Sequence, residues 1–316
     1  GWVDVTLYVN FRGCIDSLEK DSVLYVLAPI AQFNPNTYLV CNPTSLPVTF
    51  QFQNTAIEGE LEDSVALHYE WNDNSPNTNF NNAQLDLPNG GNTSHAFATY
   101  GTYQIEQVVH NYTTGCSDSI TLAVTISQLQ SAFLLPDDTI CKGDAIGLFN
   151  QSTTWSAHPV NSWIYTFGNG QQINNGANVN YVYPASGSYN ISLLVFNSAG
   201  CSSTATQTIF VANKPVAGLL APTYAGCSPL PVSFSNTSYS ITNGLPLATF
   251  NTTFSDNNTS ITTTNVNQAI NHTFVGNGVY TATITATDIN GCVSNPVSVQ
   301  ITLTKPTAII ASDTII

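Results

Sequence analysis

One stretch of the chain reads Gly187-Ser188-Tyr189-Asn190-Ile191-Ser192-Leu193-Leu194-Val195, and the pair Gly200-Cys201 follows it. From Tyr189 to Val195 every second residue is apolar, which is the period of a strand with one buried face. The glycine before the cysteine suits a tight turn that needs a positive φ angle. We therefore predict a half-buried strand that leads into a hairpin.

The same pattern returns along the chain. The Gly-Cys pair occurs at four places, separated by 102, 85 and 91 residues: 13–14, 115–116, 200–201 and 291–292. A Gly-x-Tyr triplet stands before each of the last three pairs, at 101–103, 187–189 and 278–280. Because a recurring period indicates a repeat architecture, we predict a string of small β modules.

The repeat sets the expected domain boundaries. We expect the C-terminal part of one module, three whole modules and the first strand of a fifth, at residues 1–29, 30–128, 129–213, 214–304 and 305–316. The chain contains no methionine, and both of its ends fall inside modules. We therefore expect it to be a segment of a longer polypeptide.

Composition excludes several classes of partner. Only 8% of the 316 residues are charged, and 5 Lys and Arg stand against 19 Asp and Glu, which gives a net charge of −14. Nucleic acid and anionic membrane surfaces are excluded, because phosphate binding needs clustered Lys and Arg. No apolar run approaches the roughly 20 residues of a membrane-spanning helix, so we expect no direct membrane insertion.

Short alternating segments with frequent turn signals predict an all-β fold. Strand patterns follow the Gly-Cys pairs, as in residues 120–126 and 297–303, and no segment shows a helical period. Such strands favour a β-sandwich. Lys214-Pro215 and Lys305-Pro306 lead into apolar residues without a Gly/Ser linker, and proline stiffens a junction. We therefore expect tandem β-sandwich modules arranged as a rod.

The seven cysteines indicate an oxidising compartment. Because each whole module has one early cysteine and one Gly-Cys cysteine, we expect bonds within modules: Cys41 with Cys116, Cys141 with Cys201, and Cys227 with Cys292. Cys14 is left to pair upstream of the segment. Each closed loop would add roughly 4 kcal/mol of stability. The alternatives are seven reduced thiols or a zinc site, and no two cysteines have the close spacing of zinc ligands.

The wider pattern resembles the PKD domain, an immunoglobulin-like β-sandwich. The family has an aromatic-x-Phe-Gly-Asp-Gly stretch, then a His/Tyr-x-Tyr/Phe pair, then Gly-x-Tyr. The middle module has Tyr165-Thr166-Phe167-Gly168-Asn169-Gly170 and Tyr181-Val182-Tyr183. The flanking modules have Trp71-Asn72-Asp73-Asn74 and Phe254-Ser255-Asp256-Asn257, which lack both glycines. The resemblance covers essentially the whole chain and implies tandem immunoglobulin-like domains.

The composition points to one group of proteins with PKD repeats. Tandem PKD repeats that are rich in Asn and Thr and poor in Lys resemble the giant cell-surface adhesins of gliding Bacteroidota, of the SprB type. That resemblance implies export by type IX secretion and an extracellular, cell-surface location. It also implies a part in surface adhesion or gliding motility.

An Asp-Ser/Thr-aliphatic pattern recurs in the chain and looks like the O-glycosylation sequon of Bacteroidota. Ordinary sequence at the edge of a strand is the alternative. The candidate acceptor residues are Ser17, Ser22, Ser64, Ser119, Thr139 and Thr314.

The sequence contains no motif for catalysis, so we expect no enzyme activity. Nucleophile elbows, zinc-binding helices and phosphate loops are absent. His95 and His272 occupy equivalent repeat positions where the middle module has Tyr181, so packing on a strand explains them better than catalysis. The other histidines, His68, His110 and His158, have no sequence partners that suggest a triad or a metal site.

We call the stretch that corresponds to Phe-Gly-Asp-Gly of the family the hallmark loop. Its Asp position holds Asp73, Asn169 and Asp256. Short polar side chains in a turn often bond the backbone of a residue that follows closely. We therefore expect these three side chains to hold their own turns.

Two further features are candidates for binding. The acidic run Glu58, Glu60, Glu62 and Asp63 could supply oxygen ligands to Ca²⁺, although its spacing is irregular and a solvated loop is favoured. No other cofactor is expected. Trp155 and Trp163 lie in an insertion of the middle module and are the candidate aromatics for stacking on a glycan.

The favoured function is structural. We expect a repetitive stalk segment of a secreted cell-surface adhesin or filament, whose modules hold a distant binding tip away from the cell. Two alternatives stay open: spacers of an extracellular polysaccharide- or protein-degrading enzyme, or modules that bind glycans themselves. The expected partners are neighbouring modules of the same chain and extracellular glycans or surfaces.

Overall fold

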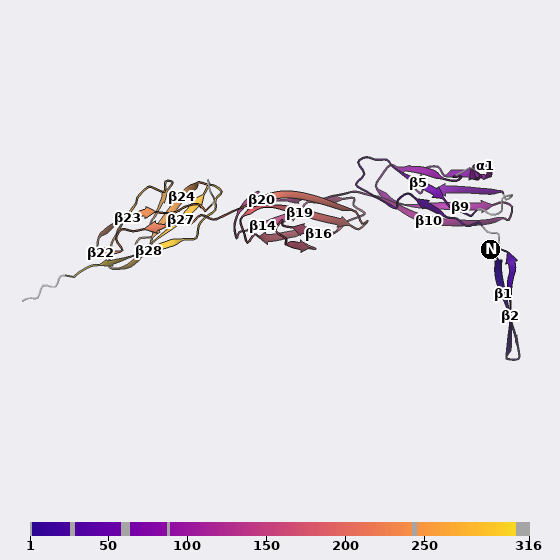
Figure 1. Ribbon diagram of the computed structural model, residues 1–316, viewed down its shortest axis with the longest axis horizontal. Helices are drawn as coiled ribbons and strands as arrows, with labels where there is room; N and C mark the ends of the chain where they lie inside the picture. Colours follow the sequence, from indigo (N-terminus) through magenta and orange to yellow (C-terminus); the bar gives the residue numbers. More distant parts are fainter. Residues whose placement is uncertain (1, 26–28, 58–63, 87–88, 242–244, 308–316) are drawn as a thin grey trace, which may run out of the picture. The chain divides into compact units, whose positions relative to one another are not determined.

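The computed structural model describes residues 2–25, 29–57, 64–86, 89–241 and 245–307 (Figure 1). These residues form β-strands and one short helix, α1 (Asn82–Leu85). The fold is therefore all-β, as the alternating sequence patterns predict. No helix in this part of the chain is long and apolar enough to cross a membrane.

The chain forms two compact units. The first comprises residues 1–132, 152–163 and 194–204, and the second comprises residues 133–151, 164–193 and 205–316. The division passes through the middle module, so each unit combines segments that lie far apart in the sequence.

The first whole module has two sheets. The five-stranded sheet has the order β4-β10-β9-β6-β7, and the three-stranded sheet has the order β3-β5-β8. The strands are β3 (Phe33–Pro35), β4 (Leu39–Cys41), β5 (Val48–Asn54), β6 (Val65–Glu70), β7 (Thr78–Asn81), β8 (Thr93–Phe97), β9 (Gly101–Asn111) and β10 (Cys116–Ser127).

The middle module repeats this strand order. Its sheets are β13-β20-β19-β16-β17 and β12-β14-β18, and a two-stranded sheet pairs β11 with β15. The strands are β11 (Leu129–Gln130), β12 (Phe133–Leu134), β13 (Thr139–Cys141), β14 (Ala145–Asn150), β15 (Thr153–Thr154), β16 (Val160–Thr166), β17 (Gln172–Asn174), β18 (Asn178–Val182), β19 (Gly187–Asn197) and β20 (Ser202–Ala212).

The last whole module has the same order again, in the sheets β22-β28-β27-β24-β25 and β21-β23-β26. The strands are β21 (Leu219–Leu220), β22 (Ala225–Cys227), β23 (Leu230–Asn236), β24 (Leu247–Phe254), β25 (Ser260–Thr263), β26 (Ile270–Phe274), β27 (Gly278–Asp288) and β28 (Val297–Thr304). The identical orders show that the sequence repeat is a structural repeat.

A hydrophobic core fills each of the first and last whole modules. In the first, β9 buries Ile105 and Val109 and β5 buries Phe50 and Phe52, in the alternation that one buried face requires. The last module buries equivalent aromatic and aliphatic side chains, such as Phe234. Full burial of one such side chain contributes about 1.5–3 kcal/mol, so these cores supply much of the stability of each sandwich.

A short parallel strand lies beside the end of the last strand of each module. β4 pairs in parallel with β10, β13 with β20, and β22 with β28. The early cysteine is the third residue of each short strand. This pairing therefore places the early cysteine where the chain leaves the module.

A tyrosine fixes the start of the long strand in two modules. The hydroxyl of Tyr103 donates to the carbonyl of Thr99 at 2.9 Å, and that of Tyr189 donates to the carbonyl of Ala185 at 3.0 Å. This arrangement is the tyrosine corner of immunoglobulin-like sandwiches. It explains why an aromatic residue follows the glycine in the Gly-x-Tyr repeat.

The N-terminal part of the chain is a separate two-stranded hairpin of β1 (Trp2–Phe11) and β2 (Cys14–Tyr25). It corresponds in sequence to the β9–β10 hairpin. Exposed apolar side chains lie on both strands, including Leu7 at 60% and Leu18 at 67%. Within the described residues no second sheet pairs with this hairpin, so it shows the strand pattern of a module without a core.

Candidate functional site at the module junctions

Two disulfides join an early cysteine to the hairpin of the following module. Cys41 bonds to Cys201 and Cys141 bonds to Cys292, and the Cα–Cα distance is 5.5 Å in both. The sequence separations are 160 and 151 residues. We call each of these bonds a staple: the first staple is Cys41–Cys201, and the second is Cys141–Cys292.

The structure overturns the three bonds that the sequence predicted within modules: Cys41–Cys116, Cys141–Cys201 and Cys227–Cys292. Cys41 pairs with Ser127, the last residue of β10, whereas Cys116 is the first residue of that strand. At about 3.3 Å per residue, the two ends of the strand lie roughly 35 Å apart. A disulfide needs Cα atoms within about 7 Å, so these cysteines cannot meet.

Backbone hydrogen bonds hold each early cysteine beside the last strand of its module. The N–H of Asn42 donates to the carbonyl of Ser127 at 2.9 Å. At the second staple, the N–H of Lys142 donates to the carbonyl of Ala212 at 2.8 Å. The two cysteines therefore occupy equivalent, fixed positions at the exit of their modules.

An Asn or Asp side chain shapes each stapled hairpin. Oδ1 of Asn197 accepts from the N–H of Cys201 at 3.0 Å, and Oδ1 of Asp288 accepts from the N–H of Cys292 at 2.9 Å. The glycines before the cysteines have φ angles of 94° and 81°, which favour glycine. Both hairpin cysteines are only 1% exposed, so each disulfide is buried where it joins the hairpin.

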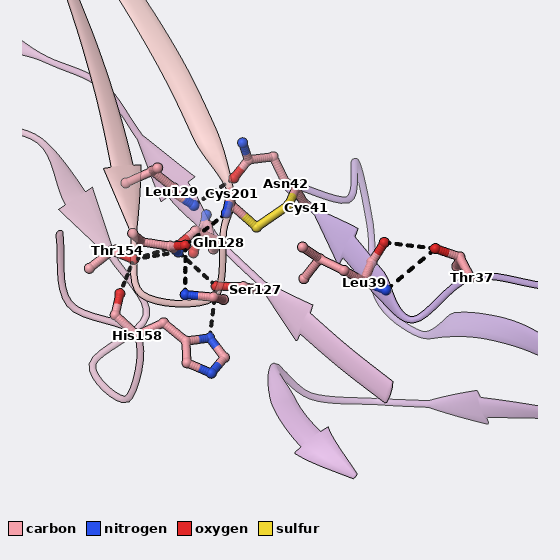
Figure 2. Close-up of a disulfide and its surroundings, with 12 residues drawn as sticks. Thr37, Leu39, Cys41, Asn42, Ser127, Gln128, Leu129, Thr154, His158 and Cys201 are labelled. Atoms are coloured by element: carbon pink, nitrogen blue, oxygen red, sulfur yellow. Dashed lines mark hydrogen bonds between the residues drawn. A yellow bond between two sulfur atoms is a disulfide. The ribbon is translucent and has the colours of Figure 1, made fainter. Parts of the chain in front are cut away.

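A network of polar side chains surrounds the first staple (Figure 2). Oγ of Ser127 accepts from Nδ2 of Asn197 at 2.9 Å and lies 3.0 Å from Nδ1 of His158. Oδ1 of Asn42 accepts from the N–H of Leu129 at 2.5 Å. Ser127 and Asn197 are buried, where an unpaired polar group would cost free energy. The network therefore couples the end of one module to the hairpin of the next.

Among the described residues, the second staple has no equivalent of the contact between Ser127 and Asn197. Ala212 takes the place of Ser127, and Asp288 takes the place of Asn197. Asp288 is 2% exposed, and its Oδ2 has no hydrogen-bond partner among the residues that the structure describes. An exposed ion pair, Lys214 Nζ to Asp144 Oδ1 at 2.7 Å, lies at this junction instead. Pairs of this kind contribute only about 0–1 kcal/mol.

A second polar cluster lies at the hallmark loop of the first and last modules. Nε2 of His95 is 2.7 Å from Oδ2 of Asp73, and Nε2 of His272 is 2.9 Å from Oδ1 of Asp256. Each imidazole stacks on a buried aromatic ring, with centroids 4.5 and 3.9 Å apart: Trp71 and Phe254. The predicted packing of both histidines is confirmed, and each also has an aspartate partner that the sequence analysis missed.

The middle module keeps this arrangement with different residues. Nδ2 of Asn169 donates to the hydroxyl of Tyr181 at 2.8 Å, and the Tyr181 ring stacks on Phe167 with centroids 3.7 Å apart. A neutral Asn–Tyr pair thus replaces an Asp–His pair. What the modules share is a stacked ring with one hydrogen bond to the loop, which is a structural role.

The prediction that the three loop side chains hold their own turns is confirmed for two of them, Asp73 and Asn169. Oδ1 of Asp73 accepts from the N–H of Ser75 at 3.0 Å, and Oδ1 of Asn169 accepts from the N–H of Gln171 at 3.2 Å. Burial disfavours the charge of Asp73, but hydrogen bonds from Ser75 and His95 outweigh burial and hold the pKa of Asp73 below its ordinary value. The charged form of Asp73 is therefore favoured in the folded protein.

The family model of the PKD domain matches residues 131–211 and 212–303, which together make up more than half of the sequence. The chain belongs to the PKD-domain family. Residues 33–127 lie outside these matches but have the same strand order as the two matched PKD domains. The structure thus extends the PKD-like architecture to the first whole module.

Several solved structures match this chain at low sequence identity. The ICAM-5 D1–D4 ectodomain fragment is 9% identical, with a TM-score of 0.50, over 96% of this chain and 83% of that chain. The titin I-band fragment I67–I69 is 10% identical, with a TM-score of 0.44, over 90% and 100%. A structure from a 1.5-MDa bacterial ice-binding adhesin is 14% identical, with a TM-score of 0.34, over 88% and 98%.

The ICAM-5 comparison shows an immunoglobulin-like fold and nothing of function. No significant match is found among the curated proteins. The function of these PKD domains has therefore to be argued from their own residues.

The two tryptophans predicted to bind a glycan have different surroundings. Trp155 belongs to the first junction: its N–H donates to the carbonyl of Gln128 at 3.1 Å, and its ring packs edge-on against His158 at 4.8 Å. Trp163 lies on β16, and its buried indole N–H has no partner in the described part of the chain. Glycan binding by either residue stays a prediction.

The predicted glycosylation sites are mostly accessible. Ser17, Ser22, Ser64 and Ser119 are exposed. Thr139 is half-buried, and its hydroxyl donates to Oδ1 of Asp138 at 3.1 Å. Thr314 lies outside the described residues. Modification of these side chains stays a prediction.

The acidic run proposed for Ca²⁺, Glu58 to Asp63, also lies outside the described residues. A different acidic group is present on the N-terminal hairpin, where carboxylate oxygens of Asp4, Glu19 and Asp21 lie within 4.8 Å of one another. All three side chains are exposed, and exposed acidic groups are common without an ion. We assign no metal to them.

The sequence analysis missed the side chain that holds each hairpin turn, and it missed Ser127 at the first staple. Asn111, Asn197 and Asp288 each lie ten residues after the glycine of a Gly-x-Tyr triplet. This repeat position holds only Asn or Asp in the three whole modules, which was the signal for a turn-holding side chain. No comparable signal marked Ser127, because the equivalent residue at the second staple is Ala212.

Proposed function

We propose that the chain is a stalk segment of a secreted cell-surface adhesin or filament, in which stapled PKD domains bear tension. The observation that supports this proposal is the connectivity of the two disulfides. Each staple joins successive domains, so each junction has a second covalent path beside the backbone. A spacer that only separates two domains has no need of such a path.

The staples also limit extension, because their loops overlap. Cys141 lies inside the loop closed by Cys41–Cys201, and Cys201 lies inside the loop closed by Cys141–Cys292. With both bonds intact, the shortest covalent path from residue 30 to residue 304 runs back along residues 141–201. That path is about a third of the backbone length. Complete unfolding would therefore lengthen the oxidised segment far less than the reduced segment.

The proposal includes no catalytic role for these domains. The polar clusters at the hallmark loops exchange His and Asp for Tyr and Asn while the ring stacking is kept. A catalytic acid or base would not tolerate that exchange, because tyrosine and asparagine titrate far from neutral pH or not at all.

The proposal extends to location and organisation. Disulfides persist in oxidising, extracellular spaces, which supports a secreted protein. Export by type IX secretion, gliding motility and the glycosylated residues belong to the proposal through the resemblance to Bacteroidota adhesins. So do the domain boundaries expected from the repeat.

Immunogold labelling of the producing cells with antibody against this segment tests the location. Label along fibres that project from the cell surface is expected. Label confined to soluble secreted protein would overturn the stalk and favour a spacer in an extracellular enzyme.

Single-molecule stretching tests the mechanical part. Handles at residues 30 and 304 should give a fully extended length in oxidising buffer of about a third of that after reduction. Equal lengths in the two buffers would show that the staples do not limit extension.

A further inference from the structure

Cys227 carries no disulfide in the structure, yet it occupies the position of the two stapled early cysteines. Cys41 pairs with Ser127 and Cys141 pairs with Ala212, and each partner is the last residue of the last strand of its domain. Cys227 pairs with Thr304, the last residue of β28. The strand register around the three cysteines is therefore the same.

The backbone around Cys227 also has the same hydrogen bonds. The N–H of Ser228 donates to the carbonyl of Thr304 at 3.1 Å, which corresponds to the bonds of 2.9 and 2.8 Å that follow Cys41 and Cys141. On the other side, the N–H of Thr302 donates to the carbonyl of Tyr224 at 2.8 Å. The equivalent bonds at the two staples are 2.9 and 2.8 Å. Cys227 is thus held as its stapled counterparts are, and it is exposed.

We propose that Cys227 is the open half of a third staple, a covalent docking site for the hairpin of another PKD domain. This inference does not rest on the stalk function, since a third staple would join PKD domains in an adhesin and in an enzyme alike.

The two existing staples define the chemistry of the partner. Both bonded hairpins have the form Asn/Asp-x-x-Gly-Cys, at residues 197–201 and 288–292. In both, the side chain of the first residue accepts from the N–H of the cysteine. The partner of Cys227 should therefore present a hairpin of this length, with a glycine before its cysteine.

The other unbonded cysteines of the chain do not have this hairpin geometry. Cys116 stands one residue further from its asparagine, and Oδ1 of Asn111 accepts from Thr113 and Thr114 at 2.9 and 3.0 Å. Cys14 has the same sequence form, from Asn10 to Cys14, but its turn is shorter, because Cys14 pairs directly with Phe11. There Oδ1 of Asn10 accepts from the N–H of Gly13 at 3.3 Å. The expected partner is therefore a PKD domain other than those in this sequence, in the same polypeptide or in a separate chain.

The bond forms by thiol–disulfide exchange with a low-molecular-weight disulfide as oxidant. The thiolate of Cys227 attacks one sulfur of the oxidant, which releases one small thiol and leaves a mixed disulfide. The thiolate of the hairpin cysteine then attacks the Cys227 sulfur and releases the second small thiol. Two protein thiols are oxidised, and one small disulfide is reduced to two thiols.

Peptide mapping of the native protein tests the proposal. The protein is isolated without reductant, its free thiols are blocked with N-ethylmaleimide, and the digest is analysed by mass spectrometry. The Cys227 peptide is expected in a disulfide with a new peptide that contains Asn/Asp-x-x-Gly-Cys. The linked peptides Cys41–Cys201 and Cys141–Cys292 are the internal controls.

Non-reducing electrophoresis separates the two sources of the partner. A chain of unchanged size places the partner domain in the same polypeptide, and larger species that collapse on reduction place it in a separate chain. Either result, together with the linked peptide, supports the proposal. Cys227→Ser should remove the linked peptide and leave its hairpin cysteine alkylated, whereas Cys14→Ser should leave the link intact.

Two results would overturn the third staple. One is Cys227 alkylated by N-ethylmaleimide while both control disulfides are present. The other is Cys227 linked to a cysteine outside such a hairpin, or to Cys14, Cys116 or Cys292. Neither result bears on whether antibody labels surface fibres, so the stalk proposal is tested independently.

Discussion

At the first junction the hairpin is held by a disulfide and by paired polar side chains, whereas the second junction has a disulfide with the same Cα–Cα distance and, within the described residues, no such pairing. Ser127 bridges Asn197 and His158 at the first. At the second, Ala212 cannot bridge, and Oδ2 of Asp288 has no partner among the described residues. The disulfide sets which parts meet, and the polar contacts adjust how firmly they are held.

The largest expected effect comes from removing each staple in turn. On the chain-entropy model, closing a loop of about 150 residues contributes about 5 kcal/mol. The two loops have nearly equal lengths, so Cys41→Ser/Cys201→Ser and Cys141→Ser/Cys292→Ser should destabilise by similar amounts. Differential scanning calorimetry in oxidising buffer measures this, with Cys14→Ser as the control. A loss in one double variant only would show that the staples are not equivalent.

Removing a polar side chain from the network around the first staple should cause the next largest loss of stability. Ser127→Ala leaves a buried amide of Asn197 with one bond fewer, which costs about 1–3 kcal/mol. Thermal unfolding of the oxidised protein measures the loss. Thr121→Ala, an exposed substitution on the same strand, is the matched control. If both variants unfold alike, the network around the first staple does not contribute to stability.

A double-mutant cycle at the second staple should rebuild the missing network. Ala212→Ser supplies a hydroxyl, and Asp288→Asn supplies the amide that Asn197 provides at the first staple. We expect the free energy of unfolding of the double variant to exceed the value expected from adding the two single changes by about 1 kcal/mol. Urea unfolding of the four proteins gives the coupling free energy. A coupling of zero would mean that the two junctions differ in more than these residues.

The smallest expected effect is the acid sensitivity of the hallmark loop. The pKa of Asp73 is lowered in the folded state, so its contribution to stability is present above about pH 4, the ordinary value, and is lost as pH falls through the folded pKa. Asp73→Asn should cost about 1 kcal/mol at neutral pH, with the difference from wild type vanishing in acid.

The middle module offers the control for this prediction. Asp73→Asn/His95→Tyr copies the Asn169–Tyr181 pair and should unfold without that acid-dependent step. Unfolding curves between pH 2 and 7 would contradict the role of Asp73 if the difference between wild type and Asp73→Asn did not change with pH.

The sandwich fold could be predicted because its cause is local. Period-two alternation after Gly187 predicts β19, and the same pattern after Gly278 predicts β27. The packing role of His95 and His272 followed from their exchange with Tyr181. In these cases the structure depends on residues that are close together in the sequence or that recur at the same repeat position.

The staple partners could not be predicted in this way. Which cysteines meet depends on which ends of a strand face each other, and β10 separates Cys41 from Cys116 by its whole length. The deciding contact is the parallel pairing of β4 with the far end of β10, between residues that are distant in the sequence. Counting one early and one late cysteine per module gave the right cysteine types and the wrong partners.

The overlapping loops have a consequence for survival among proteases. Every peptide bond between Cys41 and Cys292 lies inside at least one closed loop, so one cut there leaves both pieces covalently joined. Surface loops are where proteases usually cut. Bonds within modules would have left residues 117–140 outside any loop, and one cut would have severed the chain. The overlapping disulfides instead let the protein be nicked and still remain a single molecule.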